Sequence, residues 1–168
     1  MAKARKKVQA RRKPAARKAN ARRAVKAKTQ VKQRPKNRPK NRPKHKFTVS
    51  HHREQDFDQG LRSYAKYRDL GIAPATGGMV QAHVIRFIPP FKPEDVSTPH
   101  YHDVEFQMIY VLKGWIKSDF EGEGVHTFNA GSCWIQPPKI KHAVVNYSDD
   151  CELLEIVLPA DFETVTLA

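Results

Sequence analysis

Apolar and polar residues alternate in short runs over the second half of the chain, and loop-forming residues separate these runs. The first run, 81–88, is rich in β-branched and aromatic residues and ends at Pro89-Pro90. Seven more runs follow, over 101–103, 107–112, 115–120, 124–128, 132–136, 143–147 and 152–158. Pro, Gly, Asn, Asp or Ser lies in the turns between most of them. Many short strands without intervening helices predict an all-β fold, an antiparallel sandwich or barrel.

The residues before these runs have a different pattern. Phe57, Leu61, Tyr64 and Ala65 have helical spacing, although for two turns only, and several glycines between 71 and 78 then indicate a loop. We therefore expect residues 47–79 to form an N-terminal extension that packs on the barrel. The barrel domain itself is expected over residues 80–168.

Residues 1–46 contain no aromatic side chain and consist mainly of Lys, Arg, Ala, Pro, Gln and Asn. Such a segment buries too little apolar area to offset the entropy of ordering it, so a disordered tail is predicted. Proline at every fourth position between 35 and 43 favours an extended, polyproline-like chain. The first thirty residues are richer in Ala and are expected to gain helix against a polyanion.

Charge separates the tail from the rest of the chain. The tail holds 21 Lys or Arg and no acid, while residues 47–168 carry 10 Lys or Arg and all 17 acids, so the charges are +21 and −7. Counterion release makes such a tail bind nonspecific nucleic acid or another polyanion. An anionic membrane surface, an organelle-targeting peptide and a merely solubilising appendage are the alternatives. Without a long apolar run or a secretory signal, we expect a cytoplasmic protein with no membrane span.

Cys133 and Cys151 are too few for a disulfide scaffold. They could pair if their strands are neighbours, but two reduced and partly buried thiols are the simpler interpretation.

The residues best suited to chemistry are His100, His102 and His142. Two imidazoles one residue apart on a strand point to the same face, and a third from a later strand can complete a pocket for a divalent metal such as Fe, Ni, Mn or Zn. The alternative is a pair of ordinary polar residues at a strand edge.

Residues 100–146 resemble the two motifs of the cupin superfamily. The chain has His100-x-His102, four residues, Gln107, six residues and Gly114. It continues with Gly131, five residues, Pro137-Pro138-Lys139, two residues, His142, three residues and Asn146. The resemblance to a small single-domain cupin of the conserved-barrel cupin 2 type implies a double-stranded β-helix, or jelly-roll barrel. It also implies a metal held by His100, His102, Gln107 and His142.

Two positions depart from the family pattern: Gln107 stands where Glu is usual and Lys139 where Gly is usual. An amide oxygen is a neutral and weaker ligand, so Glu105 is an alternative carboxylate if its strand extends that far. Lys139 implies a strained turn, costing on the order of 1–2 kcal/mol, or a different turn type. Further expectations are that His142, Val144 and Asn146 share one face, and that Gly114 and Gly131 serve turns with positive φ or a close approach.

The resemblance leaves several functions open. A metal-dependent dioxygenase acting on a small organic substrate is one hypothesis, and a ligand-binding or regulatory cupin tethered to nucleic acid by its tail is another. Isomerase or lyase chemistry is a third, for which His83 and Tyr110 are the candidate catalytic residues, although His83 also fits a core position. Trp134 or Gln136 is expected to line the pocket. Similar proteins often pair through barrel edges, so a homodimer is expected.

Overall fold

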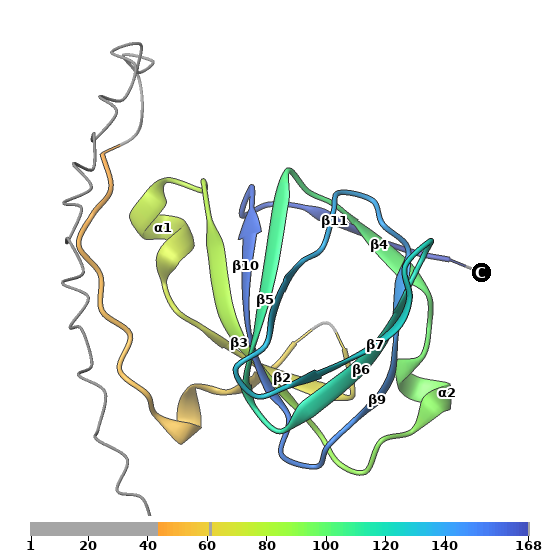
Figure 1. Ribbon diagram of the computed structural model, residues 1–168. Helices are drawn as coiled ribbons and strands as arrows, with labels where there is room; N and C mark the ends of the chain where they lie inside the picture. The colour runs from red at the N-terminus through yellow and green to blue at the C-terminus, as the bar shows by residue number, and fades with distance from the viewer. Residues whose placement is uncertain (1–43, 61, 168) are drawn as a thin grey trace, which may run out of the picture. The chain divides into compact units, whose positions relative to one another are not determined.

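Two antiparallel β-sheets face each other and enclose the centre of the barrel (Figure 1). The structure is a computed structural model, and it describes residues 44–60 and 62–167. The tail predictions fall on residues that are, except for 44–46, outside this described part. The prediction of an all-β jelly-roll barrel is confirmed for the body of the chain.

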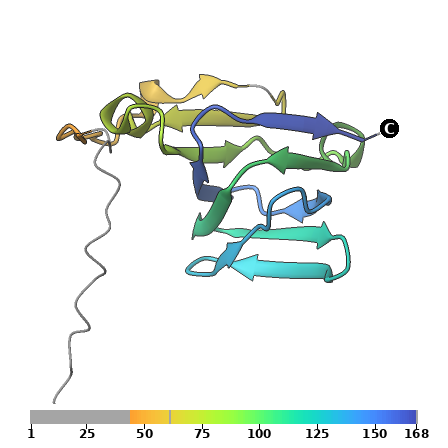
Figure 2. The ribbon, with the colours of Figure 1, turned by 90° about the horizontal axis from the view of Figure 1, so that it is seen from above.

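Six strands form the first sheet and five form the second. Figure 2 shows the same ribbon from above. In spatial order the first sheet consists of β1 (Asp58–Gln59), β2 (Ala65–Asp69), β3 (Gln81–Phe87), β10 (Glu152–Leu158), β5 (Phe106–Lys113) and β8 (Cys133–Ile135). The second consists of β11 (Glu163–Thr166), β4 (His100–Asp103), β9 (His142–Tyr147), β6 (Trp115–Phe120) and β7 (Gly124–Asn129). The described helices are short: η1 (Glu54–Asp56), α1 (Ile72–Thr76) and α2 (Pro93–Val96).

The helical spacing of apolar residues between 57 and 65 does not correspond to a helix in the described residues of this stretch. These residues instead lead through β1 into β2, which pairs with β3 in the antiparallel register Ala65↔Phe87. Two isolated helical turns are only marginally stable, whereas pairing with β3 satisfies backbone groups along a whole strand. Ala65 and Tyr67 then point to the inner face of the sheet, while Lys66 is exposed.

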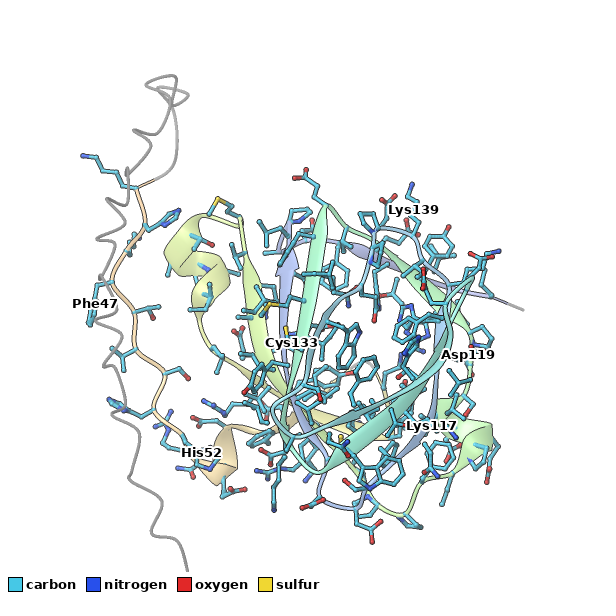
Figure 3. All side chains as sticks on the ribbon, viewed as in Figure 1. Phe47, His52, Lys117, Asp119, Cys133 and Lys139 are labelled. Carbon is cyan, nitrogen blue, oxygen red and sulfur yellow. The ribbon has the colours of Figure 1, made fainter. Side chains whose placement is uncertain are left out.

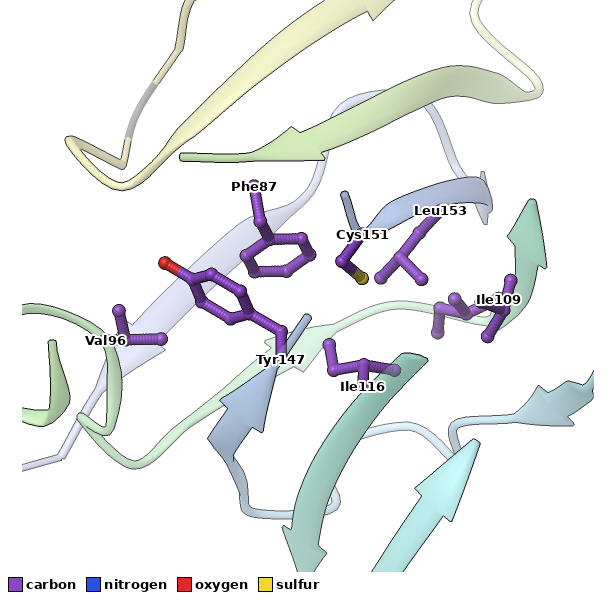
Figure 4. Close-up of a cluster of buried hydrophobic side chains, with 8 residues drawn as sticks. Phe87, Val96, Ile109, Ile116, Tyr147, Cys151 and Leu153 are labelled. Carbon is purple, nitrogen blue, oxygen red and sulfur yellow. The ribbon is translucent and has the colours of Figure 1, made fainter. Parts of the chain in front are cut away.

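A cluster of buried side chains packs in part of the space between the sheets (Figure 4). Its members are Phe87, Val96, Ile109, Val111, Ile116, Tyr147, Cys151 and Leu153. Burying each of the larger apolar side chains contributes about 1.5–3 kcal/mol. Four of them, Phe87, Ile109, Ile116 and Leu153, also line the cavity described below, so the core forms one wall of that cavity.

Two thiols lie in different environments and both are free. Cys133 is exposed on β8 (Figure 3), whereas Cys151 is fully buried beside the start of β10. Burial raises the pKa of the Cys151 thiol to about 12, so this thiol stays protonated. The expectation of two unpaired cysteines is confirmed.

The turn residues of the motif behave as predicted. Gly114 has φ +65°, and a Cβ added there would lie 2.1 Å from Ser148 Oγ; Gly131 has φ +89°. Lys139 has φ +63°, so it holds the left-handed conformation that glycine adopts without strain. Of the two expectations for Lys139, the strained turn is the correct one. The described residues contain no helix long and apolar enough to cross a membrane.

Candidate metal centre

Three imidazole rings converge on the inner face of the five-stranded sheet. His100 on β4 is directly opposite His142 on β9 in the strand register, and their ring centroids lie 4.3 Å apart. The ring of His102, two residues along β4, lies 5.1 Å from that of His100 and 5.2 Å from that of His142. One nitrogen from each ring lies within 4.8 Å of the other two. The sequence prediction that these three residues meet is thus confirmed.

Each ring is anchored through its Nδ1 atom. His100 Nδ1 donates to Thr98 O at 2.9 Å, and His142 Nδ1 donates to Ile140 O at 3.0 Å. Since a carbonyl oxygen can only accept, Nδ1 carries the proton in both rings and Nε2 keeps its lone pair. His102 Nδ1 hydrogen-bonds to the hydroxyl of Thr164 at 2.9 Å. Hydrogen bonds of this kind orient the histidines that ligate metals.

Burial also keeps these rings uncharged at neutral pH. Removal from water is the largest cause that lowers the pKa of each ring, and the pKa values of His100, His102 and His142 all fall to about 4. Repulsion between neighbouring imidazoles lowers them further. A metal therefore meets three neutral rings and does not have to displace protons from them.

The three rings open into a cavity of about 310 Å³ between the sheets. This volume is at the lower end of the range for small-molecule sites, about 300–1,000 Å³. Aromatic and aliphatic side chains make most of its wall, among them Tyr64, Tyr67, Phe87, Trp134 and Phe162. Its polar residues include the three histidines, Gln107, Gln136, Glu155, His83 and Arg62.

Gln107 lies in this cavity and is only 2% exposed. Its amide nitrogen donates to Glu155 Oε1 at 2.6 Å, and its amide oxygen accepts a hydrogen bond from Gln136 Nε2 at 3.0 Å. Gln136 Nε2 also lies 2.9 Å from His142 Nε2, a contact that a bound cation would replace. Gln107 is therefore one hydrogen-bonded residue away from the three rings.

The carboxylate of the cavity belongs to Glu155 on β10. His83 Nε2 donates to Glu155 Oε2 at 2.6 Å, so both carboxylate oxygens are hydrogen-bonded. Burial alone raises the pKa of Glu155, but the hydrogen bonds from His83 and Gln107 outweigh it and hold this pKa below its ordinary value. His83 thus lies in the cavity as one of the two candidate catalytic residues from the sequence.

The structure places three other candidates outside the cavity. Glu105 is exposed and precedes β5, which starts only at Phe106, so the cavity wall does not include this carboxylate. Tyr110 is 38% exposed on the outer side of β5. Asn146 was expected to share a face with His142, but the pairing of β9 with β6 shifts register between Asn146 and Val144. Because this bulge skips Val145, Asn146 pairs with Lys117 and does not line the cavity.

The sequence did not reveal which residues hydrogen-bond to His102 and His83. Thr164 lies on β11, which pairs with β4 in the register Thr164↔His102. Glu155 lies opposite His83 across β10 and β3. Alternation along the run 152–158 offered a weak signal for an inward Glu155, but the pairing of distant strands is not visible in one sequence. For Trp134 and Gln136, of which one was expected in the pocket, both line it.

These residues fit a divalent cation. Nitrogen ligands bind Zn²⁺ at about 2.0–2.1 Å, so two of them across one ion are at most about 4.2 Å apart. The separations of up to 4.8 Å require only a small movement of the rings. Neutral imidazole also suits Fe, Ni and Cu.

Comparisons with known proteins agree with this geometry. A family model described as "Cupin domain" matches residues 90–157. No curated protein matches the chain.

Three solved structures share the fold. KdgF from a Halomonas species is 22% identical, with a TM-score of 0.51, over 66% of this chain and 94% of that one. A Bacillus subtilis oxalate decarboxylase, described for its Mn(II) centres, is 16% identical, with a TM-score of 0.53, over 68% of this chain and 30% of that one. Salicylate 1,2-dioxygenase from Pseudoaminobacter salicylatoxidans is 11% identical, with a TM-score of 0.51, over 65% of this chain and 30% of that one. At these identities the likeness establishes the fold alone.

Proposed function

This chain belongs to the cupin superfamily, and we propose that its barrel binds one divalent metal ion between His100, His102 and His142 with a small organic molecule beside it. The observation that carries the proposal is the anchoring of all three rings through Nδ1. It leaves the Nε2 atoms for a common ligand, once a bound cation replaces the contact between Gln136 and His142 Nε2. Fe, Ni, Mn and Zn are the candidate ions.

Gln107 is the fourth donor in this proposal. A carbonyl oxygen has two lone pairs, and Gln136 uses one of those on Gln107. Gln107 Nε2 donates to the negatively charged Glu155 carboxylate at 2.6 Å, and this hydrogen bond raises the electron density on the amide oxygen of Gln107. Such a second partner strengthens a ligand, and losing it typically costs 10–100-fold in metal affinity.

The reaction that we favour is the dioxygenation of a small organic substrate. A bound Fe(II) would supply the oxygen chemistry, while the protein supplies geometry and surroundings. The aromatic wall holds the substrate and excludes water. His83, oriented by Glu155, is placed on the cavity wall where it can accept or return a substrate proton.

Oxygen consumption tests this assignment. Iron-loaded protein is expected to consume oxygen with one or more members of a panel of phenols, diketones and thiols, and the His142→Ala variant is not. A fully iron-loaded protein that consumes no oxygen counts against dioxygenation. Product formed without oxygen would instead identify an isomerase or lyase.

A second function is suggested by the separation of charge along the chain. Residues 1–46 carry +21, while the remainder carries −7. We propose that the tail holds the barrel on nucleic acid or a similar polyanion. Retention on DNA is expected for the full chain, with steep loss as salt increases, and not for residues 47–168. Equal retention of the two would refute tethering by the tail.

Pairing of two copies is also part of the proposal. Tyr110 and Leu112 on β5 and Ile135 on the edge strand β8 are exposed apolar side chains on neighbouring strands. Edge strands that carry such side chains are usually covered. Light scattering is expected to give twice the 19.2 kDa mass of one chain.

A further inference from the structure

Arg62 brings a positive charge to the cavity wall that no acidic side chain neutralises. It lies in the turn before β2, where its carbonyl oxygen accepts hydrogen bonds from Gln59 Nε2 at 2.7 Å and from Ala65 N at 3.3 Å. Its side chain is half-buried and lines the cavity. Every Asp and Glu of the chain is among the described residues, and none of them forms an ion pair with Arg62.

Glu155, the acid inside the cavity, does not neutralise the charge of Arg62. Both oxygens of Glu155 are engaged, one by His83 and the other by Gln107. Arg62 instead shares the cavity wall with the three imidazoles.

The proposed metal centre adds to the imbalance. Three neutral imidazoles and an amide leave the full charge of a divalent cation uncompensated by its ligands. Together with Arg62, the cation gives the cavity an excess of positive charge even after the single charge of Glu155 is counted. Uncompensated charge away from water is costly, and an anionic ligand removes this cost.

The remaining wall indicates what the anion carries. Tyr64, Tyr67, Phe87, Trp134 and Phe162 present aromatic surface to a space of about 310 Å³. Such a space admits a ligand about the size of one substituted ring. A large or highly hydroxylated ligand would leave its polar groups against apolar side chains, without hydrogen-bond partners.

We propose that the ligand of this cavity is a small organic acid with an apolar body, and that Arg62 binds its carboxylate. This deepens the proposed function and rests on it for the charge of the cation, but not for the charge of Arg62. A guanidinium group binds a carboxylate through two parallel hydrogen bonds, so Arg62 also sets the orientation of the ligand.

Benzoate and benzamide provide a matched pair of probes, because they differ in charge but hardly in shape. The indole N–H signal of Trp134, assigned with a Trp134→Phe variant, reports binding inside the cavity of the full chain. Titrations are made with zinc-loaded and with metal-free protein.

In zinc-loaded protein benzoate is expected to bind about tenfold or more tightly than benzamide, the range for a hydrogen bond to a charged group. Arg62→Gln should weaken benzoate binding about tenfold and leave benzamide binding unchanged, while Arg62→Lys should recover part of the loss. Lys66→Gln removes a positive charge from the exposed side of β2 and should change neither probe.

Equal affinity for the two probes, an equal effect of Arg62→Gln on both, or no response of Trp134 to either would overturn the proposal. The metal-free titration separates this outcome from a failure of the metal centre. If zinc does not bind at all, Arg62 still predicts a preference for benzoate that Arg62→Gln abolishes.

Discussion

Lowering the pH from 7 to 5 should destabilise the metal-free protein, because three buried imidazoles resist protonation. Their folded-state pKa values are about 4, below the ordinary value of 6.5. Between these two values the unfolded chain binds more protons than the folded chain. Stability is therefore fully present above pH 6.5 and is lost as the pH falls toward 4.

The size of this effect follows from the same values. A pH of 5 lies roughly 1.5 units below the ordinary imidazole pKa, so each ring lowers the free energy of unfolding by about 2 kcal/mol at this pH. Three rings together reach roughly 6 kcal/mol, comparable with the whole stability of a typical domain, about 5–15 kcal/mol. Acid should thus bring the metal-free protein close to unfolding.

Urea unfolding followed by tryptophan fluorescence, at several pH values between 7 and 5 and after removal of metal, measures this slope. His102→Gln should reduce the pH dependence by about one third, because one of three titrating rings is gone. Thr127→Gln on exposed β7 introduces the same side chain elsewhere and should keep the wild-type slope. A free energy of unfolding that does not change over this range, or an unchanged slope in His102→Gln, would refute the reasoning.

Three further predictions concern the surroundings of the centre. Glu155→Gln should weaken zinc affinity 10–100-fold, as measured by competition with a chelator; an unchanged affinity means that Glu155 does not act through Gln107. Gln107→Glu should lower the free energy of unfolding of the metal-free protein by about 1–3 kcal/mol, because two carboxylates then replace the 2.6 Å hydrogen bond between Gln107 and Glu155. Adding Glu155→Gln to this variant should restore the free energy of unfolding. Lys139→Gly should raise the free energy of unfolding by about 0.5–1 kcal/mol, because glycine adopts the left-handed conformation without strain. Asp103→Asn removes only the exposed ion pair of Lys139 and should change this free energy little. A loss of stability in Lys139→Gly would contradict the strain.

The strands around the metal centre were predictable from the sequence, because burial of one face of a strand makes apolar and polar residues alternate along it. The run 115–120 coincides with β6, and the run 152–158 coincides with β10. β2 and β11 were not predicted. β2 carries charged residues among few apolar ones, and β11 has only four residues, so each is a strand only because it pairs with a neighbour.

The three histidines were predictable for a related reason. The spacing of His100 and His102 fixes a common face on any strand, and the turn at Pro137-Pro138 leads into a new strand at His142. The hydrogen-bond partners were not predictable. Thr98 and Ile140 act through backbone carbonyls, which carry no sequence signal, and Glu155 meets Gln107 through strand pairing across the sheet.

The most direct test is the metal content of the protein purified without added metal and then equilibrated separately with Fe, Mn, Ni and Zn. Three anchored imidazoles that share one cavity predict one ion per chain for at least one of these metals. The His102→Ala variant should bind far less of the same metal while keeping its fold. A wild-type chain that retains none of the four ions, or a variant that retains as much as the wild type, would contradict the account.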